Sequence, residues 1–122
     1  MVKPVYTFPA ISFIGGETKK MMFTLLTERG NDFDASECSA CFAIINYANK
    51  NGSPILTKDA EIIIGNNGVR NIVSVELSSA DTLYMHGRFI YQISLVSPQG
   101  DMEIPGQGII DITRNIHPQF IK

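Results

Sequence analysis

Residues 87–113 read GRFIYQISLVSPQGDMEIPGQGIIDIT, and this stretch carries the strongest structural signal in the chain. In its first arm an apolar set alternates with residues of mixed polarity, and that set is Phe89, Tyr91, Ile93 and Leu95. A period of two predicts a strand with one buried face. Pro98 and Gly100 suit a short hairpin loop, so the second arm is predicted to return beside the first. Gly106 and Gly108 would weaken a strand interior, and we expect a bulge or bend there.

Shorter stretches of the same kind occupy the rest of the chain. Strands are predicted at residues 20–27, 39–47, 55–57, 60–64 and 71–77. Segment 20–27 is apolar on both faces, which predicts a central strand, and a bend is expected at residues 58–59. Segment 71–77 alternates cleanly and should point Val73, Val75 and Leu77 inward.

One helical turn is predicted between the strands. Ser78 and Asp81 match the Ser-x-x-acid signature that begins a helix, so we expect one turn over residues 81–83. No segment has a helical period lasting three turns. Short strands separated by turns about every ten residues predict an all-β fold. The expected architecture is an immunoglobulin-like antiparallel β-sandwich of Greek-key type, with at most one short helical turn.

The expected organisation has three parts. Residues 1–16 form an N-terminal arm or edge strand, because Pro4 and Pro9 cannot donate to a sheet ladder. Residues 17–113 form the sandwich domain. Residues 114–122 have no periodicity and are a C-terminal extension.

Composition limits the classes of function. The 122 residues suit one globular domain, with 44% hydrophobic and 18% charged residues. The net charge of −2, without clustered basic residues, argues against a nucleic-acid partner. The first residues do not resemble a secretion signal, and no apolar run could span a bilayer. These features predict a soluble protein made in the cytoplasm of its host, with no membrane partner.

The cysteine pair Cys38 and Cys41 has Cys-x-x-Cys spacing but lacks the context of a zinc or redox site. If residues 38–47 form a strand, the two sulfurs lie on opposite faces and cannot bond. We expect two free thiols.

Other candidate chemistry is weak. The loop residues Asp32, Asp34 and Glu37 suggest calcium, yet the glycine and distal glutamate of an EF-hand are missing. His86 and His117 are not flanked by a nucleophile motif. We therefore predict no enzymatic activity, no cofactor and no metal. A pair of carboxylates that meets only in the fold leaves a small hydrolase as an alternative.

A sugar-stacking platform is a further alternative. The aromatic residues that could form it are Tyr6, Phe8, Tyr47, Tyr84 and Tyr91. Aromatic residues in a β-sandwich more often pack in the core or pair across strands. A carbohydrate- or cell-surface-binding module nevertheless stays open.

From residue 39 onward the order of signals resembles a known family. The signals are the turn Asn-Gly-Ser-Pro at 51–54, Val-Ser-Val-Glu-Leu at 73–77, Gly-Arg-Phe-Ile-Tyr-Gln-Ile at 87–93, and Ile-Asp-Ile-Thr-Arg-Asn-Ile at 110–116. Together they resemble the N-terminal immunoglobulin-like domain of phage baseplate upper proteins. The resemblance implies a non-enzymatic structural protein of a phage or prophage tail, located in the virion.

The arm and the extension are the segments that the expected core explains least. We expect them to dock on neighbouring virion proteins or within a small homo-oligomer. The assembly contacts expected from these segments are Tyr6, Phe8, Phe13 and Phe120.

Overall fold

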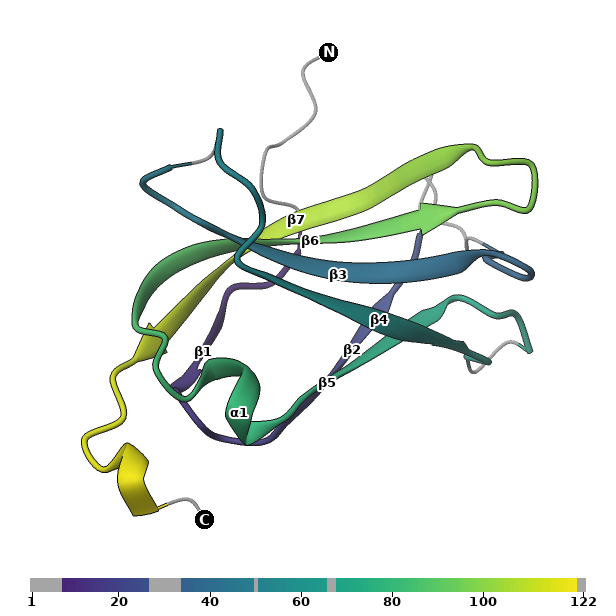
Figure 1. Ribbon diagram of the computed structural model, residues 1–122. Coiled ribbons are helices and arrows are strands. Elements are labelled where there is room, and N and C mark those ends of the chain that lie inside the picture. The colour runs from purple at the N-terminus through teal and green to yellow at the C-terminus, as the bar shows by residue number, and fades with distance from the viewer. Residues whose placement is uncertain (1–7, 27–33, 50, 66–67, 121–122) are drawn as a thin grey trace.

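The computed structural model describes residues 8–26, 34–49, 51–65 and 68–120. Strands dominate this part of the chain (Figure 1). In chain order the elements are β1 (Ile11–Ile14), β2 (Lys19–Thr24), β3 (Ser39–Asn46), β4 (Leu56–Ile63), β5 (Ile72–Leu77), α1 (Ser79–Thr82), β6 (Gly87–Val96), β7 (Met102–Thr113) and the 3-10 turn η1 (Pro118–Phe120). The predicted all-β class is confirmed.

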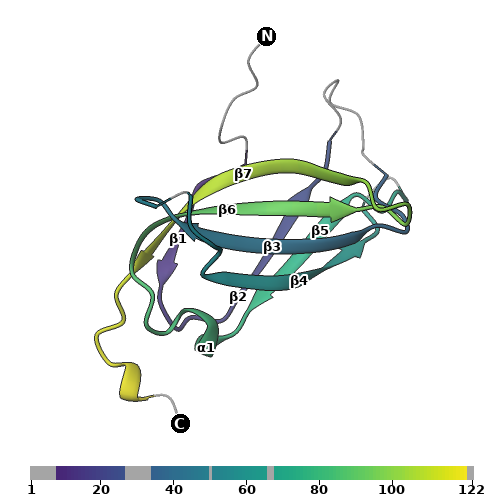
Figure 2. The same cartoon turned by 45° about the horizontal axis from the view of Figure 1, so that its top comes forward.

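The strands form one curled sheet in the order β1-β7-β6-β3-β4-β5-β2. β1 and β2 lie at opposite edges of this order, although only residues 15–18 separate them in the chain. The sheet therefore curls until its edges approach each other at this turn, which produces a half-barrel. Figure 2 shows β2 and β5 crossing behind β3 and β6.

The pairing is antiparallel except between β1 and β7, which run parallel. The expectation of a purely antiparallel sheet is wrong at this edge. The pairing is parallel there because the first strand lies beside the last strand and runs in the same direction. β1 is an edge strand, as expected for part of residues 1–16.

The strand β4 connects the two halves of the sheet. Residues 56–60 pair with β3, and residues 61–63 pair with β5. We expected two short strands with a bend at 58–59. The structure has one strand, and its change of neighbour lies between Ala60 and Glu61.

The hairpin of β6 and β7 follows the prediction closely. Its inward residues Phe89, Tyr91, Ile93 and Leu95 are all buried, and Gly100 has a φ of 91°. A register shift lies beside Gly106, where Ile104 and Pro105 together oppose one residue of β6. Gly108 has another reason, because a Cβ atom there would lie 2.5 Å from the ring of Tyr91.

Aromatic rings fill the centre of the half-barrel. The ring of Tyr91 lies 5.4 Å from that of Phe23 and 5.7 Å from that of Phe42, measured between centroids. Phe8 stacks on Phe23 at 5.3 Å. Since β2 and β6 are not neighbours in the sheet, these contacts hold its two halves together across the interior.

The position of β2 differs from the prediction. It is the last strand of the sheet, and its Met22 side chain is 56% exposed, whereas we expected a central strand. Apolar residues on both faces of a strand show which side chains can be buried. They do not show which strands lie beside it in the sheet. The helical prediction is nearly correct, since α1 is one turn over Ser79–Thr82. The tail adds a second short turn, η1.

Candidate functional site

The C-terminal tail is held against the turn that joins β1 to β2. The side-chain amide of Asn115 donates to the carbonyl oxygen of Gly15 at 2.8 Å, and its oxygen accepts from the backbone N–H of His117 at 2.8 Å. The backbone N–H of Gly15 donates to the carbonyl oxygen of Thr113 at 2.9 Å. Both polar ends of the Asn115 side chain therefore fix the path of the tail.

Glycine is required at this junction. A Cβ atom on Gly15 would lie 2.6 Å from the carbonyl oxygen of Thr82, so a larger residue would separate the turn from α1. The next residue, Gly16, donates its backbone N–H to the buried hydroxyl of Thr82 at 3.0 Å. The turn, α1 and the base of the tail thus meet through backbone atoms and short side chains.

An ion pair fixes α1 to the sheet. The ammonium group of Lys58 on β4 lies 2.9 Å from Oδ2 of Asp81, which also accepts from the backbone N–H of Ser78 at 2.8 Å. Burial acts to raise the pKa of Asp81, but the hydrogen bonds from Lys58 and Ser78 outweigh it and hold the pKa below its usual value. This arrangement positions the link that leads from α1 to β6.

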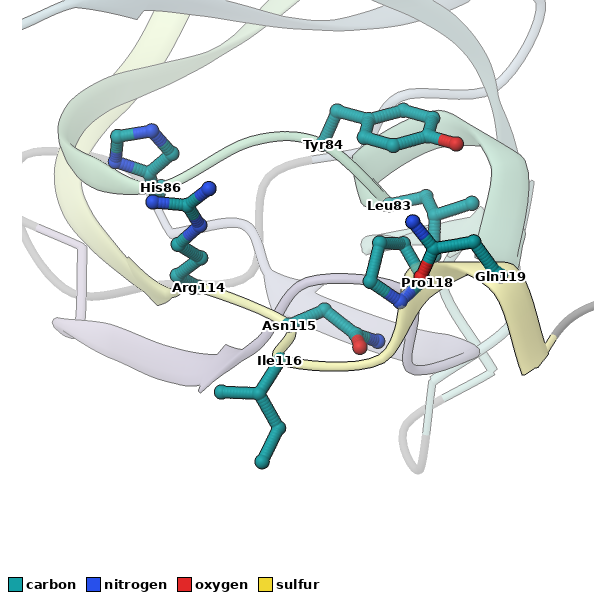
Figure 3. A pocket seen from close by; sticks show the side chains of 8 residues that line it. All are labelled: Leu83, Tyr84, His86, Arg114, Asn115, Ile116, Pro118 and Gln119. Atoms are coloured by element: carbon teal, nitrogen blue, oxygen red, sulfur yellow. The ribbon is translucent and has the colours of Figure 1, made fainter.

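A hollow of about 600 Å³ lies between that link and the tail. Its lining residues are Leu83, Tyr84, His86, Arg114, Asn115, Ile116, Pro118 and Gln119. Figure 3 shows His86 and Arg114 toward one side, Tyr84 with Pro118 and Gln119 toward the other, and the side chain of Ile116 directed away. The site therefore combines a basic side with an aromatic and amide side.

The charge of the hollow has one sign. No Asp or Glu is among its lining residues. Arg88 forms two hydrogen bonds to Asp111, at 2.9 and 3.3 Å, and Arg70 donates to the carbonyl oxygen of Ile62. Arg114 is exposed and makes no such bond to any residue that the structure describes. Its guanidinium group is therefore available to an incoming anion.

Large apolar side chains are exposed on the link before β6 and on the C-terminal tail. Tyr84 is 76% exposed, Ile116 is 97% exposed and Phe120 is 74% exposed. The ring of Phe120 contacts that of His117, at 5.6 Å between centroids. Three such side chains on one end of a small domain are typical of a contact surface. We call Tyr84, Ile116 and Phe120 the apolar rim.

The expected assembly contacts are in different environments. Phe8 and Phe13 both pack in the interior of this domain, Phe8 half-buried against Phe23 and Phe13 only 6% exposed. Phe120 lies on the apolar rim. Tyr6 lies outside the described residues.

The other aromatic candidates do not form one platform. Tyr91 is fully buried in the core, Tyr84 lies at the hollow, and Tyr47 contacts the guanidinium of Arg88 on the outer face of the sheet. Of the two histidines, His86 lines the hollow and His117 lies in the tail.

The remaining candidates are accounted for locally. Cys38 and Cys41 are free thiols, and Cys38 packs against the core. Asp34 accepts hydrogen bonds from the hydroxyl and backbone N–H of Ser36, which lower its pKa. Asp32 lies outside the described residues. In the part of the chain that is described, no three His, Cys, Asp or Glu side chains are grouped to hold a metal ion.

Sequence reasoning missed the hollow itself. Its walls come from residues 83–86 and 114–119, which have no periodicity. One sequence signal was available: Arg114 comes directly after the last predicted strand, and the hairpin should bring it near the residues that precede Gly87. Pairing of Gly87 with Ile112 brings these two segments together.

No family model matches the chain, and no curated protein matches it. Within the described ranges, none of the helical segments has the length and apolar character needed to cross a bilayer.

Proposed function

We propose that the chain is a non-enzymatic structural protein of a phage or prophage tail, in the baseplate, which acts through contacts with other virion proteins. The sequence order from residue 39 onward supports the family. The observation that carries the proposal is the apolar rim, with Ile116 at 97% exposure and Tyr84 and Phe120 at about three-quarters.

Water makes such a rim costly unless a partner covers it. Burying one large apolar side chain stabilises a complex by roughly 1.5–3 kcal/mol. The tail that carries Ile116 and Phe120 is held by Asn115, so little ordering is needed on binding. A small contact of this kind becomes strong when repeated around a symmetric assembly.

The strand order supports an immunoglobulin-like sandwich as the finer description of the fold. β2 pairs with β5, while β3, β6 and β7 lie together. The same division separates strands B and E from strands C, F and G in immunoglobulin domains. An experimental structure with two layers about 10 Å apart would support this description, and a continuous barrel wall would contradict it.

The functional test is co-expression with the neighbouring tail genes. Deleting the N-terminal arm would not be a clean test, because Phe13 is in the core and Phe8 packs against it. The rim variant carries Ile116→Ser and Phe120→Ser. These substitutions remove two side chains of the apolar rim and leave the core residues unchanged. The matched control is Met22→Ser with Ile64→Ser, since both residues are exposed elsewhere.

We expect tail proteins to co-purify with the parent and the control but not with the rim variant, at equal melting temperatures. The proposal is wrong if no tail protein co-purifies, or if the rim variant retains its partners.

A carbohydrate- or cell-surface-binding module is the second candidate. Tyr84 favours it, because its exposed ring could stack on a sugar, and Gln119 beside it or His86 and Arg114 across the hollow could bond to the sugar hydroxyls. Glycan binding that is lost in Tyr84→Ala and kept in the rim variant would favour this candidate.

A further inference from the structure

We propose that the hollow binds a carboxylate on an extended segment of a partner protein, with Arg114 holding the carboxylate and Tyr84 contacting an apolar side chain two residues away on the same face. The inference rests on the proposed function, because the partner is a protein of the same assembly. It adds the chemistry of that partner, which the apolar rim alone does not specify.

The charge distribution favours an acidic group. The whole chain has a net charge of −2, yet the lining of the hollow contains an arginine, a histidine and no carboxylate. The other arginines in the described ranges, Arg70 and Arg88, already bond to oxygen atoms of the protein. A guanidinium binds a carboxylate through two parallel hydrogen bonds, so Arg114 suits this group better than a neutral one.

The backbone positions both basic residues before any ligand arrives. His86 precedes β6 and Arg114 follows β7, and the pairing of Gly87 with Ile112 places these strand ends together. Asn115, the next residue, is fixed by its bonds to Gly15 and His117. Binding therefore orders the Arg114 side chain but not the main chain that carries it.

The other side of the hollow fits an apolar neighbour of the carboxylate. Leu83 is buried at its base, Pro118 is half-buried, and the ring of Tyr84 is exposed above them (Figure 3). An extended segment with Leu two residues from Glu presents both side chains on the same face, at short spacing. One full positive charge matches one carboxylate, which argues against a segment with several charges.

The probe is the blocked peptide acetyl-Gly-Glu-Gly-Leu-Gly-amide, whose Glu and Leu share one face when the chain is extended, compared with its Gln counterpart. Binding to the full chain is followed by NMR, using the side-chain N–H groups of Arg114 and Gln119 and the backbone N–H of His86. We expect these signals to move, with binding about tenfold weaker for the Gln peptide. Arg114→Gln should lose the same factor, whereas Arg70→Gln should bind like the parent.

The two peptides on the parent protein test the inference even if Arg114→Gln folds poorly. Equal binding of both peptides, no binding of either, or unchanged binding by a folded Arg114→Gln variant would overturn it. Galacturonate is a further probe, and binding tighter than that of the Glu peptide would assign the hollow to a sugar acid instead.

Failure of this inference is distinguishable from failure of the proposed function. If Arg114→Gln keeps its tail partners while the rim variant loses them, the carboxylate inference is wrong and the assembly function stands. If the Glu peptide binds but no tail protein co-purifies, the assembly function is wrong.

Discussion

The hydroxyl of Tyr91 donates a hydrogen bond of 2.6 Å to the carbonyl oxygen of Pro9. Tyr91 lies in the central hairpin, and Pro9 lies in the segment that precedes the edge strand β1. Together with the ring of Phe8, which stacks 6.3 Å from that of Tyr91, this bond attaches the N-terminal segment to the core. The segment therefore contributes to the stability of the domain.

Tyr91→Phe should reduce the free energy of unfolding by about 1 kcal/mol, because it removes this hydrogen bond and keeps the ring. Urea unfolding measures the change. Tyr84→Phe is the matched control and should leave stability unchanged, since the Tyr84 side chain is 76% exposed. An unchanged midpoint for Tyr91→Phe would mean that water replaces the bond without loss.

The same tyrosine should titrate late. Burial raises the pKa of Tyr91 to about 12, because the phenolate loses hydration in the core. The pKa of Tyr91 is higher in the folded protein than the unfolded value of about 10. The contribution of the protonated Tyr91 hydroxyl to stability is therefore complete below pH 10 and is lost as the pH rises toward 12. Absorbance titration should show a phenolate component near pH 12 that Tyr91→Phe lacks. A parent without that component would contradict the buried position.

Gly108→Ala should destabilise the domain by about 1–3 kcal/mol, because the added Cβ atom would lie 2.5 Å from the Tyr91 ring. That ring cannot withdraw easily, since it is stacked on Phe42 and tilted against Phe23. Gly52→Ala is the control, as its Cβ atom would lie 3.2 Å from the nearest atom, in the side chain of Asn49. Equal thermal melts for the two variants would show that β7 has a different register.

The ion pair of Lys58 and Asp81 predicts a loss of stability in acid. The pKa of Asp81 is lowered in the folded protein, so its contribution is present above the ordinary carboxyl range and is lost as the pH falls below about 4. Asp81→Asn should lower the free energy of unfolding by about 1 kcal/mol at neutral pH and by less in acid. The measurement is urea unfolding at neutral pH and again at a pH below about 4.

The exposed Asp59 provides the control for this pair, because it follows Lys58 and forms no ion pair within the described ranges. Asp59→Asn should leave the acid dependence as in the parent. If Asp81→Asn also leaves the acid dependence of stability unchanged, the ion pair with Lys58 does not contribute to stability.

Phe89→Ala should cost about 3–5 kcal/mol, because Phe89 is buried at the start of the hairpin. Gly100→Val should destabilise as well, since Gly100 has a φ of 91° that a β-branched residue resists. Thermal melts test both changes. Arg88→Ala is the comparison on the outer face, where the exposed ion pair with Asp111 should contribute little to stability because solvent screens it.

The candidate site was only partly predictable. Among the expected contact residues, Phe120 lies on the apolar rim, Phe13 is buried in the core and Phe8 packs against the core, and their contacts with a partner stay predictions. Apolar residues in a segment interrupted by proline look unpartnered in the sequence. The ring partners of Phe8, which are Phe23 and Tyr91, are distant along the chain and come together only when the sheet curls.

Features that depend on residues close together in the chain could be read from the amino-acid sequence. Alternation within residues 89–95 specified the buried face of β6, Gly100 specified a turn with positive φ, and Ser78 with Asp81 specified the single turn of α1. These follow from side-chain periodicity and backbone sterics, which act over a few residues.

Which segments lie side by side depends on the folded sheet as a whole. It placed β2 at an edge, set β1 parallel to β7, and brought Tyr84 and His86 beside Arg114. The physical reason is that backbone hydrogen bonds are chemically alike in every strand, so the pattern of one strand does not name its partner. Packing of Phe23 and Phe42 on Tyr91 selects among the possible pairings, and that selection needs the whole curled sheet.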